Sequence, residues 1–305
     1  MGTSLQNRLQ WVYQALLSEE TKEKGERLII YIAIAGFLVH LLLYLLTSWG
    51  FIDLNDPSKL LKSPIAATYT PFSFILVYEV YLLVYYLPKS ITTYIGKQYE
   101  IISLVIIRRL FKDLASLDLN SNWFENPDDL QFTYDLVASV LLFALIFLFN
   151  RLSVKRGLLQ ADNPEGVQLT TRKFIQLKQL LATILVPTLF ILAIYSFGDW
   201  FHEHYLSVGN LVDSMKNINN IFFDEFFTTL ILIDILLLLF SFIHTDQFHK
   251  VMRNSGFIIS TILLRLSFGV EGLVNVVLIV SAVTLGVIIL WIHNWYEKAD
   301  LGVGE

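Results

Sequence analysis

The sequence predicts an all-α fold, a polytopic bundle of transmembrane helices. Of its 305 residues, 55% are hydrophobic and only 16% are charged, and the mean hydropathy is +0.58. Several uninterrupted apolar runs are long enough to cross a bilayer as helices. The loops between these runs are too short to hold an independent soluble domain. A soluble domain of this length would need far more polar surface, so we assign the chain to the integral membrane proteins.

Composition also excludes several classes of function. The net charge of -5 is small and spread over the loops, so no nucleic-acid partner is expected. Because the chain has no cysteine, it holds no disulfide, no iron-sulfur cluster and no cysteine nucleophile. It also lacks a Gly-rich phosphate loop and a pair of catalytic carboxylates on one loop. We therefore expect no cofactor, and the balance of these signals is against an enzyme.

The polar residues 1–27 form the first predicted segment. Apolar residues recur there at helical spacing, which predicts a short amphipathic helix along the cytoplasmic membrane surface. The alternative is a frayed terminus that packs on the rest of the chain. Residues 28–297 form a single transmembrane domain, and residues 298–305 form a short cytoplasmic tail.

Seven apolar runs within that domain are each predicted to cross the membrane. They are residues 28–47, 72–87, 132–149, 180–197, 222–243, 256–270 and 273–292. An eighth segment, 98–117, is ambiguous because its first half is apolar and its second half is charged. It could cross the membrane or lie on the surface.

Lys and Arg in short loops are retained on the cytoplasmic side, so their distribution decides whether this segment crosses. If segment 98–117 stays on the surface, the inside loops hold 10 Lys and Arg residues and the outside loops hold 11. If it crosses, the inside holds 15 and the outside 3. The second arrangement has a clear bias. We therefore predict eight crossings with both termini cytoplasmic, in a multi-pass protein of the cell membrane.

Charged side chains within these segments are the first candidate functional residues, because an ionised group in the bilayer centre needs a partner or water. On a helical wheel, Arg108, Arg109, Lys112 and Asp113 share one face of segment 98–117. Counted from the turn between the second and third helices, Glu79 lies within about one helical turn of the two arginines in depth. We predict an ion pair of Glu79 with Arg108 or Arg109.

Asp234 and Arg265 are the other two charges in apolar surroundings. Asp234 lies near the middle of run 222–243, and Arg265 interrupts the next run. An acid in this position is protonated, paired or exposed to a hydrated path, and Arg265 is the nearest candidate partner. The alternative is that Arg265 extends its side chain to the outer interface. Such pairs can line a transport path, or they can serve only to hold helices together.

Two short histidine clusters are weak candidates for metal sites. His202 and His204 lie at a predicted outer membrane edge, and His244 and His249 lie at an inner one. Histidines with neighbouring carboxylates can bind a divalent metal. Neither cluster has the spacing of a known metallohydrolase motif.

The set of charges inside the membrane favours a channel or transporter for a small ion or polar solute, with Glu79, Arg108, Arg109 and Asp234 along its path. Arginines in such a path would favour anions. One alternative is a structural or signalling membrane subunit in which the same charges lock helices together. Another is a membrane-embedded metalloenzyme. Besides the lipid bilayer, the expected partner is a second copy of the chain or another membrane subunit.

Overall fold

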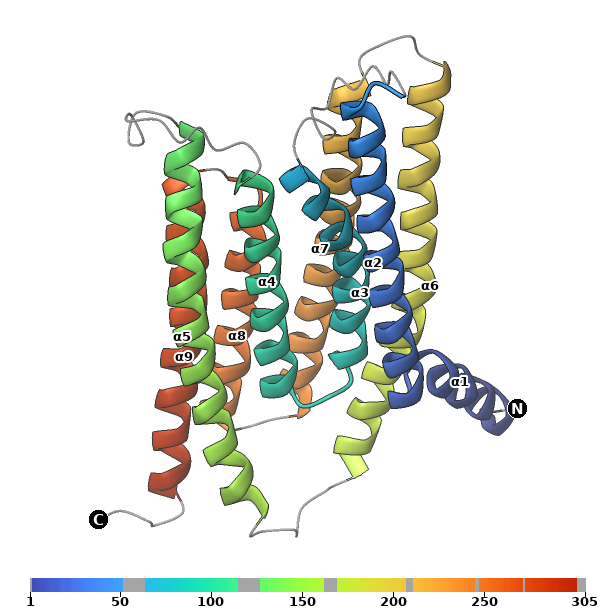
Figure 1. Ribbon diagram of the computed structural model, residues 1–305. Coiled ribbons are helices and arrows are strands. Elements are labelled where there is room, and N and C mark those ends of the chain that lie inside the picture. Colours follow the sequence, from blue (N-terminus) through green and yellow to red (C-terminus); the bar gives the residue numbers. More distant parts are fainter. Residues whose placement is uncertain are drawn as a thin grey trace. The chain divides into compact units, whose positions relative to one another are not determined.

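The structure is a computed structural model that describes residues 2–51, 64–114, 127–161, 169–206, 211–244, 247–270 and 272–300. These residues form helices and contain no strand, which confirms the all-α class (Figure 1). The elements are α1 (Gly2–Leu17), α2 (Glu19–Ser48), η1 (Pro64–Thr68), α3 (Tyr69–Tyr86), α4 (Ile91–Leu114), α5 (Pro127–Ala161), α6 (Leu169–Leu206), α7 (Leu211–His244), α8 (Phe248–Ser267) and α9 (Gly272–Asp300).

Four stretches of these helices are long and apolar enough to cross a membrane. They are Gln10–Ser48, Asp129–Val154, Phe226–Ile243 and Gly272–Ala299. Two shorter apolar helical stretches, Thr70–Tyr86 and Phe174–Leu189, add to them. This composition indicates a membrane protein. The count of eight crossings and the cytoplasmic termini stay predictions.

The chain divides into two compact units. Unit 1 comprises Met1–Tyr85, Phe111–Leu117 and Leu180–Leu230. Unit 2 comprises Tyr86–Leu110, Asp118–Gln179 and Ile231–Glu305. Unit 2 contains all of α5, α8 and α9, most of α4, and the last part of α7.

Unit 1 is held together at the junction of α1 and α2 by tyrosines of α3. The Tyr81 hydroxyl donates to the carbonyl of Leu16 at 2.9 Å, and the Tyr85 hydroxyl donates to the Glu19 carboxylate. Ser18 caps α2 by accepting a hydrogen bond from the backbone N–H of Thr21, as polar residues at this position commonly do. α1 covers residues for which a helix was predicted, and it meets α2 at this junction; its amphipathic character and its place on the membrane surface stay predictions.

The start of α4 differs from the prediction. The turn after α3 was expected to extend to residue 97, but α4 begins at Ile91. Ser90 explains this early start, because its hydroxyl accepts a hydrogen bond from the backbone N–H of Thr93. The polar residues that follow were interpreted as a loop because they lack an apolar run, although they are compatible with a helix.

α8 also begins earlier than predicted, at Phe248 rather than at residue 256. The sequence reasoning required an apolar run, and the first turns of α8 contain Arg253 and Asn254. Both side chains are buried in unit 2 and hydrogen-bonded there, so they are compatible with the helix interior.

The core of unit 2 forms where α4, α5 and α8 contribute aromatic side chains. Phe149 packs edge-on against Tyr99, with 5.1 Å between ring centroids, and it also contacts Phe257 at 5.7 Å. α9 packs along both α5 and α8 (Figure 1). Small residues on α9 allow this close packing: Ala282 is fully buried, and a Cβ atom at Gly286 would lie 1.9 Å from the Tyr99 hydroxyl.

Replacing Gly286 with alanine is therefore expected to destabilise unit 2. The added methyl group would also lie 2.8 Å from Cζ of Tyr99, so the ring would have to move away from its partners. Overpacking of this kind lowers stability by about 1–3 kcal/mol, against about 1 kcal/mol gained from helix propensity. Thermal unfolding in detergent, followed by circular dichroism, measures the difference.

Gly25→Ala on α2 is the matched control. A Cβ atom there meets the Tyr78 ring at 3.6 Å, an ordinary contact, so this variant should be as stable as the wild type or more stable. Equal stability of Gly286→Ala and the wild type would contradict the close approach of α9 to Tyr99.

Candidate functional site: the polar face of α8

α8 buries most of its polar side chains and exposes a stripe of apolar ones. Met252, Ile259 and Leu266 are each more than half exposed, and they recur every seven residues. The polar residues of α8 that are buried are Arg253, Asn254, Ser260, Thr261, Arg265 and Ser267. From Arg253 to Ser267 this polar face spans about 21 Å at 1.5 Å per residue. A helix in water would have the opposite arrangement.

The ion pair between Asp234 and Arg265 lies near the C-terminal end of this face. Nη2 of Arg265 is 2.8 Å from Oδ2 of Asp234, and both side chains are almost fully buried. The predicted pairing of these two residues is confirmed, and the alternative in which Arg265 extends to the interface is wrong. The pair joins α7 to α8 within unit 2.

Two residues of α4 complete the surroundings of the ion pair. The Tyr94 hydroxyl donates to Oδ1 of Asp234 at 2.9 Å, so both oxygens of the carboxylate accept hydrogen bonds. Gln98 accepts a hydrogen bond from Nη2 of Arg265 at 3.2 Å through Oε1. Each of these four side chains is buried.

Two donors in this centre have no acceptor among the described residues. They are Nη1 of Arg265 and Nε2 of Gln98, and both atoms are buried. A buried donor without a partner costs about 1–3 kcal/mol, and more when it is charged. Such donors bind water or the oxygen atoms of a solute where these can reach them. The centre can therefore supply hydrogen bonds to an acceptor that is not part of the protein.

A second arginine pair, between α4 and α5, lies beside the first turn of α9. The guanidinium of Arg109 contacts both carboxylate oxygens of Asp135 and donates to Oδ1 of Asn275 at 2.7 Å. Gln131 donates to Asp135 at 2.9 Å, and Asn275 donates to the carbonyl of Ser267. This cluster thus connects to the last residue of the polar face of α8.

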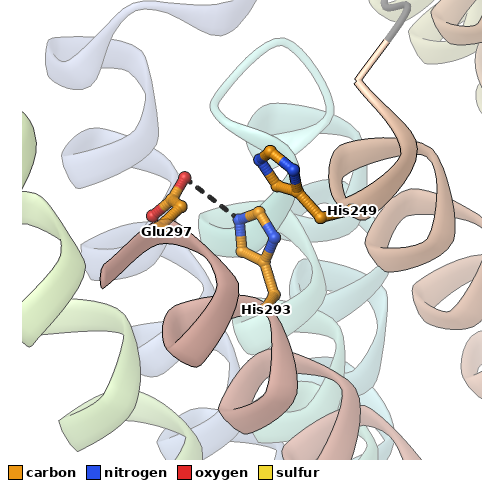
Figure 2. Close-up of side chains that lie close together, drawn as sticks. All are labelled: His249, His293 and Glu297. Carbon is orange, nitrogen blue, oxygen red and sulfur yellow. Dashed lines mark ion pairs between the residues drawn. The ribbon is translucent and has the colours of Figure 1, made fainter. Parts of the chain in front are cut away.

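A third polar cluster lies at the other end of that face, near the start of α8. Arg253 donates from Nε and Nη2 to Oδ1 of Asn254, and its Nη1 is 2.9 Å from Nε2 of His293. Nδ2 of Asn254 donates to Ser241 at 2.6 Å. Figure 2 shows His249 and Glu297 beside His293, with the Glu297 carboxylate 3.1 Å from Nε2 of the buried imidazole.

The predicted site residues have different outcomes in the structure. Arg109 has Asp135 as its acidic partner rather than the predicted Glu79. Glu79 is buried in unit 1, and its pairing with Arg108 stays a prediction. The remaining predicted site residues have side chains outside the described part of the structure. They are Lys112, Asp113, His202, His204 and His244.

Sequence reasoning missed Asp135, His293 and Glu297. Asp135 lies near the start of an apolar run, where an acid at the interface needs no partner. His293 and Glu297 follow the last apolar run. Their spacing of four residues places them on one helix face, and this spacing could have predicted that they lie together.

The fold and this site define a class: an all-α protein with helices long and apolar enough to span a membrane and with charged side chains paired in the interior of unit 2. Comparison of the chain with known protein families, with curated protein sequences and with solved structures finds no significant match.

Removing one partner of the central ion pair should destabilise unit 2 strongly. Arg265→Met leaves Asp234 in apolar surroundings without its cation, and such losses cost about 3–5 kcal/mol. The double variant Asp234→Leu with Arg265→Met should recover most of that loss, because it leaves no uncompensated charge. Unfolding by denaturant in detergent micelles gives the coupling between the two positions.

The control is the pair of Glu20 and Lys24 on α2, where the two charged atoms are 2.7 Å apart but both side chains are exposed. Water screens this pair, so the corresponding cycle of variants should show no comparable coupling. If the Asp234 and Arg265 variants are simply additive, the ion pair does not determine stability.

Proposed function

We propose that this protein is a channel or transporter that moves a small ion or polar solute through the membrane. The observation that carries the proposal is the ion pair of Asp234 with Arg265, where Arg265 and the neighbouring Gln98 keep buried donors that have no acceptor among the described residues. Such donors are suited to the oxygen or halide atoms of a solute and offer nothing to a bare cation. We therefore infer a preference for anions or neutral polar solutes.

The arrangement of α8 supports this proposal. Its exposed apolar side chains suit lipid, and its buried polar side chains give hydrogen-bonding groups at several depths. Ser260 lies between the arginines at the two ends of the polar face. Its hydroxyl is 2.6 Å from the Tyr99 hydroxyl, so hydroxyl groups continue the polar face between the charged clusters.

The remaining charges are assigned to the same path as part of the proposal. Glu79, Arg108 and Arg109 would line it together with Asp234, in a multi-pass protein of the cell membrane. We propose eight crossings, both termini in the cytoplasm, and a second copy of the chain or another membrane subunit as partner.

The second candidate is a structural or signalling membrane subunit, which the pair of Arg109 with Asp135 favours. There the carboxylate accepts hydrogen bonds from both Arg109 and Gln131, as expected of a contact that only holds helices together.

Flux measurements on purified protein in liposomes separate these two functions. We expect passage of small anions in the wild type and a loss of about tenfold or more in Arg265→Gln, because each 1.4 kcal/mol added to the barrier lowers the rate tenfold. Asp234→Asn should shift selectivity further toward anions, since it leaves the arginine uncompensated. Glu79→Gln tests whether the path includes that residue.

Ile259→Leu, on the exposed face of α8, is the matched control and should leave flux within about twofold of the wild type. Absence of flux of cations, anions and protons, with the protein folded, would refute transport and favour the structural role. Unchanged flux in Arg265→Gln would also refute it.

The topology has a separate test. A reporter fused within residues 121–129 should lie outside the cell if segment 98–117 crosses the membrane, because every later loop then changes sides. Accessibility of the reporter to an impermeant reagent measures its side. A cytoplasmic location would contradict eight crossings.

A further inference from the structure

We propose that His249, His293 and Glu297 form a binding site for a divalent transition-metal ion of the zinc type. His249 lies in the first turn of α8, and the other two residues lie near the end of α9 (Figure 2). One possible ligand atom from each of the three residues lies within 4.8 Å of those from the other two. The inference does not depend on the proposed transport.

The distances between these groups are close to those that a tetrahedral ion requires. Zinc bonds of about 2.0–2.1 Å at tetrahedral angles put neighbouring ligand atoms roughly 3.4 Å apart. Nε2 of His293 and Oε1 of Glu297 are already 3.1 Å apart, because a spacing of four residues puts them on one face of α9. His249 has to approach by at most about 1.4 Å, the difference between 4.8 Å and the required separation, which a change in its side-chain torsions can supply.

The two imidazoles are also arranged as ligands of one ion would be. Their ring centroids are 5.2 Å apart, and two imidazoles bound tetrahedrally to the same zinc ion have centroids about 5 Å apart. The ring of His249 also lies near that of Tyr296, with centroids 6.3 Å apart and planes 8° from parallel. The site is thus largely formed by packing.

The ligand types determine the class of metal. Two imidazole nitrogens and one carboxylate suit zinc, cobalt and nickel, whereas magnesium and calcium prefer oxygen ligands throughout. The three side chains leave a fourth tetrahedral position for water or another ligand.

Arg253 adds a specific feature to this site. Its Nη1 is 2.9 Å from Nε2 of His293, the nitrogen that faces Glu297. The lone pair of this nitrogen can bind either the N–H group of Arg253 or the ion, so the two are mutually exclusive. Binding of the ion at this nitrogen therefore requires Nη1 of Arg253 to move away from His293. The positive charge of Arg253 also weakens binding of a cation.

The test uses the full-length protein, purified in detergent and freed of metal with a chelator. Titration with cobalt(II), followed by its visible absorption, should give one ion per chain with the intensity of a tetrahedral site, and zinc should displace it. Loss of a residue that only supports a metal ligand weakens metal affinity by about 10- to 100-fold, and loss of a ligand itself should weaken it at least as much. His249→Asn, His293→Asn and Glu297→Gln should each weaken it at least as much, with folding verified by circular dichroism.

Two further variants sharpen the test. Arg253→Gln should bind cobalt more tightly than the wild type, because the competing N–H donor and its charge are gone. His40→Asn is the control: His40 lies in unit 1, 2.6 Å from the Thr70 hydroxyl, and its loss should leave binding unchanged.

Three results would overturn the proposal. The first is that the folded wild type binds neither cobalt nor zinc. The second is that His293→Asn or Glu297→Gln binds metal with the full affinity of the wild type. The third is that binding is lost when His202 and His204 are replaced by asparagine. Weaker binding by Arg253→Gln would overturn the placement of the ion at Nε2 of His293.

Discussion

The ion pair of Asp234 with Arg265 is the interaction on which the interior of unit 2 depends. An isolated charge in apolar surroundings would cost several kcal/mol, and each of these residues offsets a large part of that cost for the other. The pair joins α7 to α8, and Tyr94 and Gln98 attach α4 to the same centre. Burial of Arg265 fixes the rotation of α8 about its axis.

The two faces of α8 follow from that fixed rotation. Arg253, Ser260 and Ser267 recur every seven residues on the buried face, while the exposed apolar set recurs with the same spacing one residue earlier in the chain. One residue is about 100° of rotation, so the two sets point in clearly different directions. An apolar environment suits the exposed side chains of such a helix, and the buried polar side chains need polar partners. The four helices apolar enough for a membrane are consistent with such an environment.

The long apolar runs allowed prediction of the fold class, and the charges inside those runs allowed prediction of the pair of Asp234 with Arg265. A charge inside an apolar run is conspicuous and must have a partner nearby, so Asp234 identifies Arg265. The same reasoning did not find Asp135, the acidic partner of Arg109, because a charge at the edge of an apolar run can reach water and needs no partner.

The predicted starts of α4 and α8 were wrong because the first turns of these helices contain polar residues. The first turns of α8 and α4 are rich in polar side chains, and a search for apolar runs assigns these residues to loops. Their side chains are satisfied by contacts far away in sequence, such as that of Arg253 with His293, 40 residues later. A single sequence does not show such contacts, and the convergence of His249, His293 and Glu297 depends on them too.

The two arginine and aspartate pairs of unit 2 differ in a way that separates a structural contact from a functional one. Asp135 accepts hydrogen bonds from Nε and Nη2 of Arg109. The side chain of Arg109 is 27% exposed, so its remaining N–H groups can reach a polar environment. Arg265 has only 2% of its side chain exposed, and it keeps a donor for which no described residue supplies an acceptor. If locking helices together were its only role, a buried methionine or leucine would do the same without the unsatisfied donor. The donor that has no acceptor among the described residues is therefore the feature on which the proposed transport depends, because a solute at this centre, like an ordered water molecule, would satisfy it.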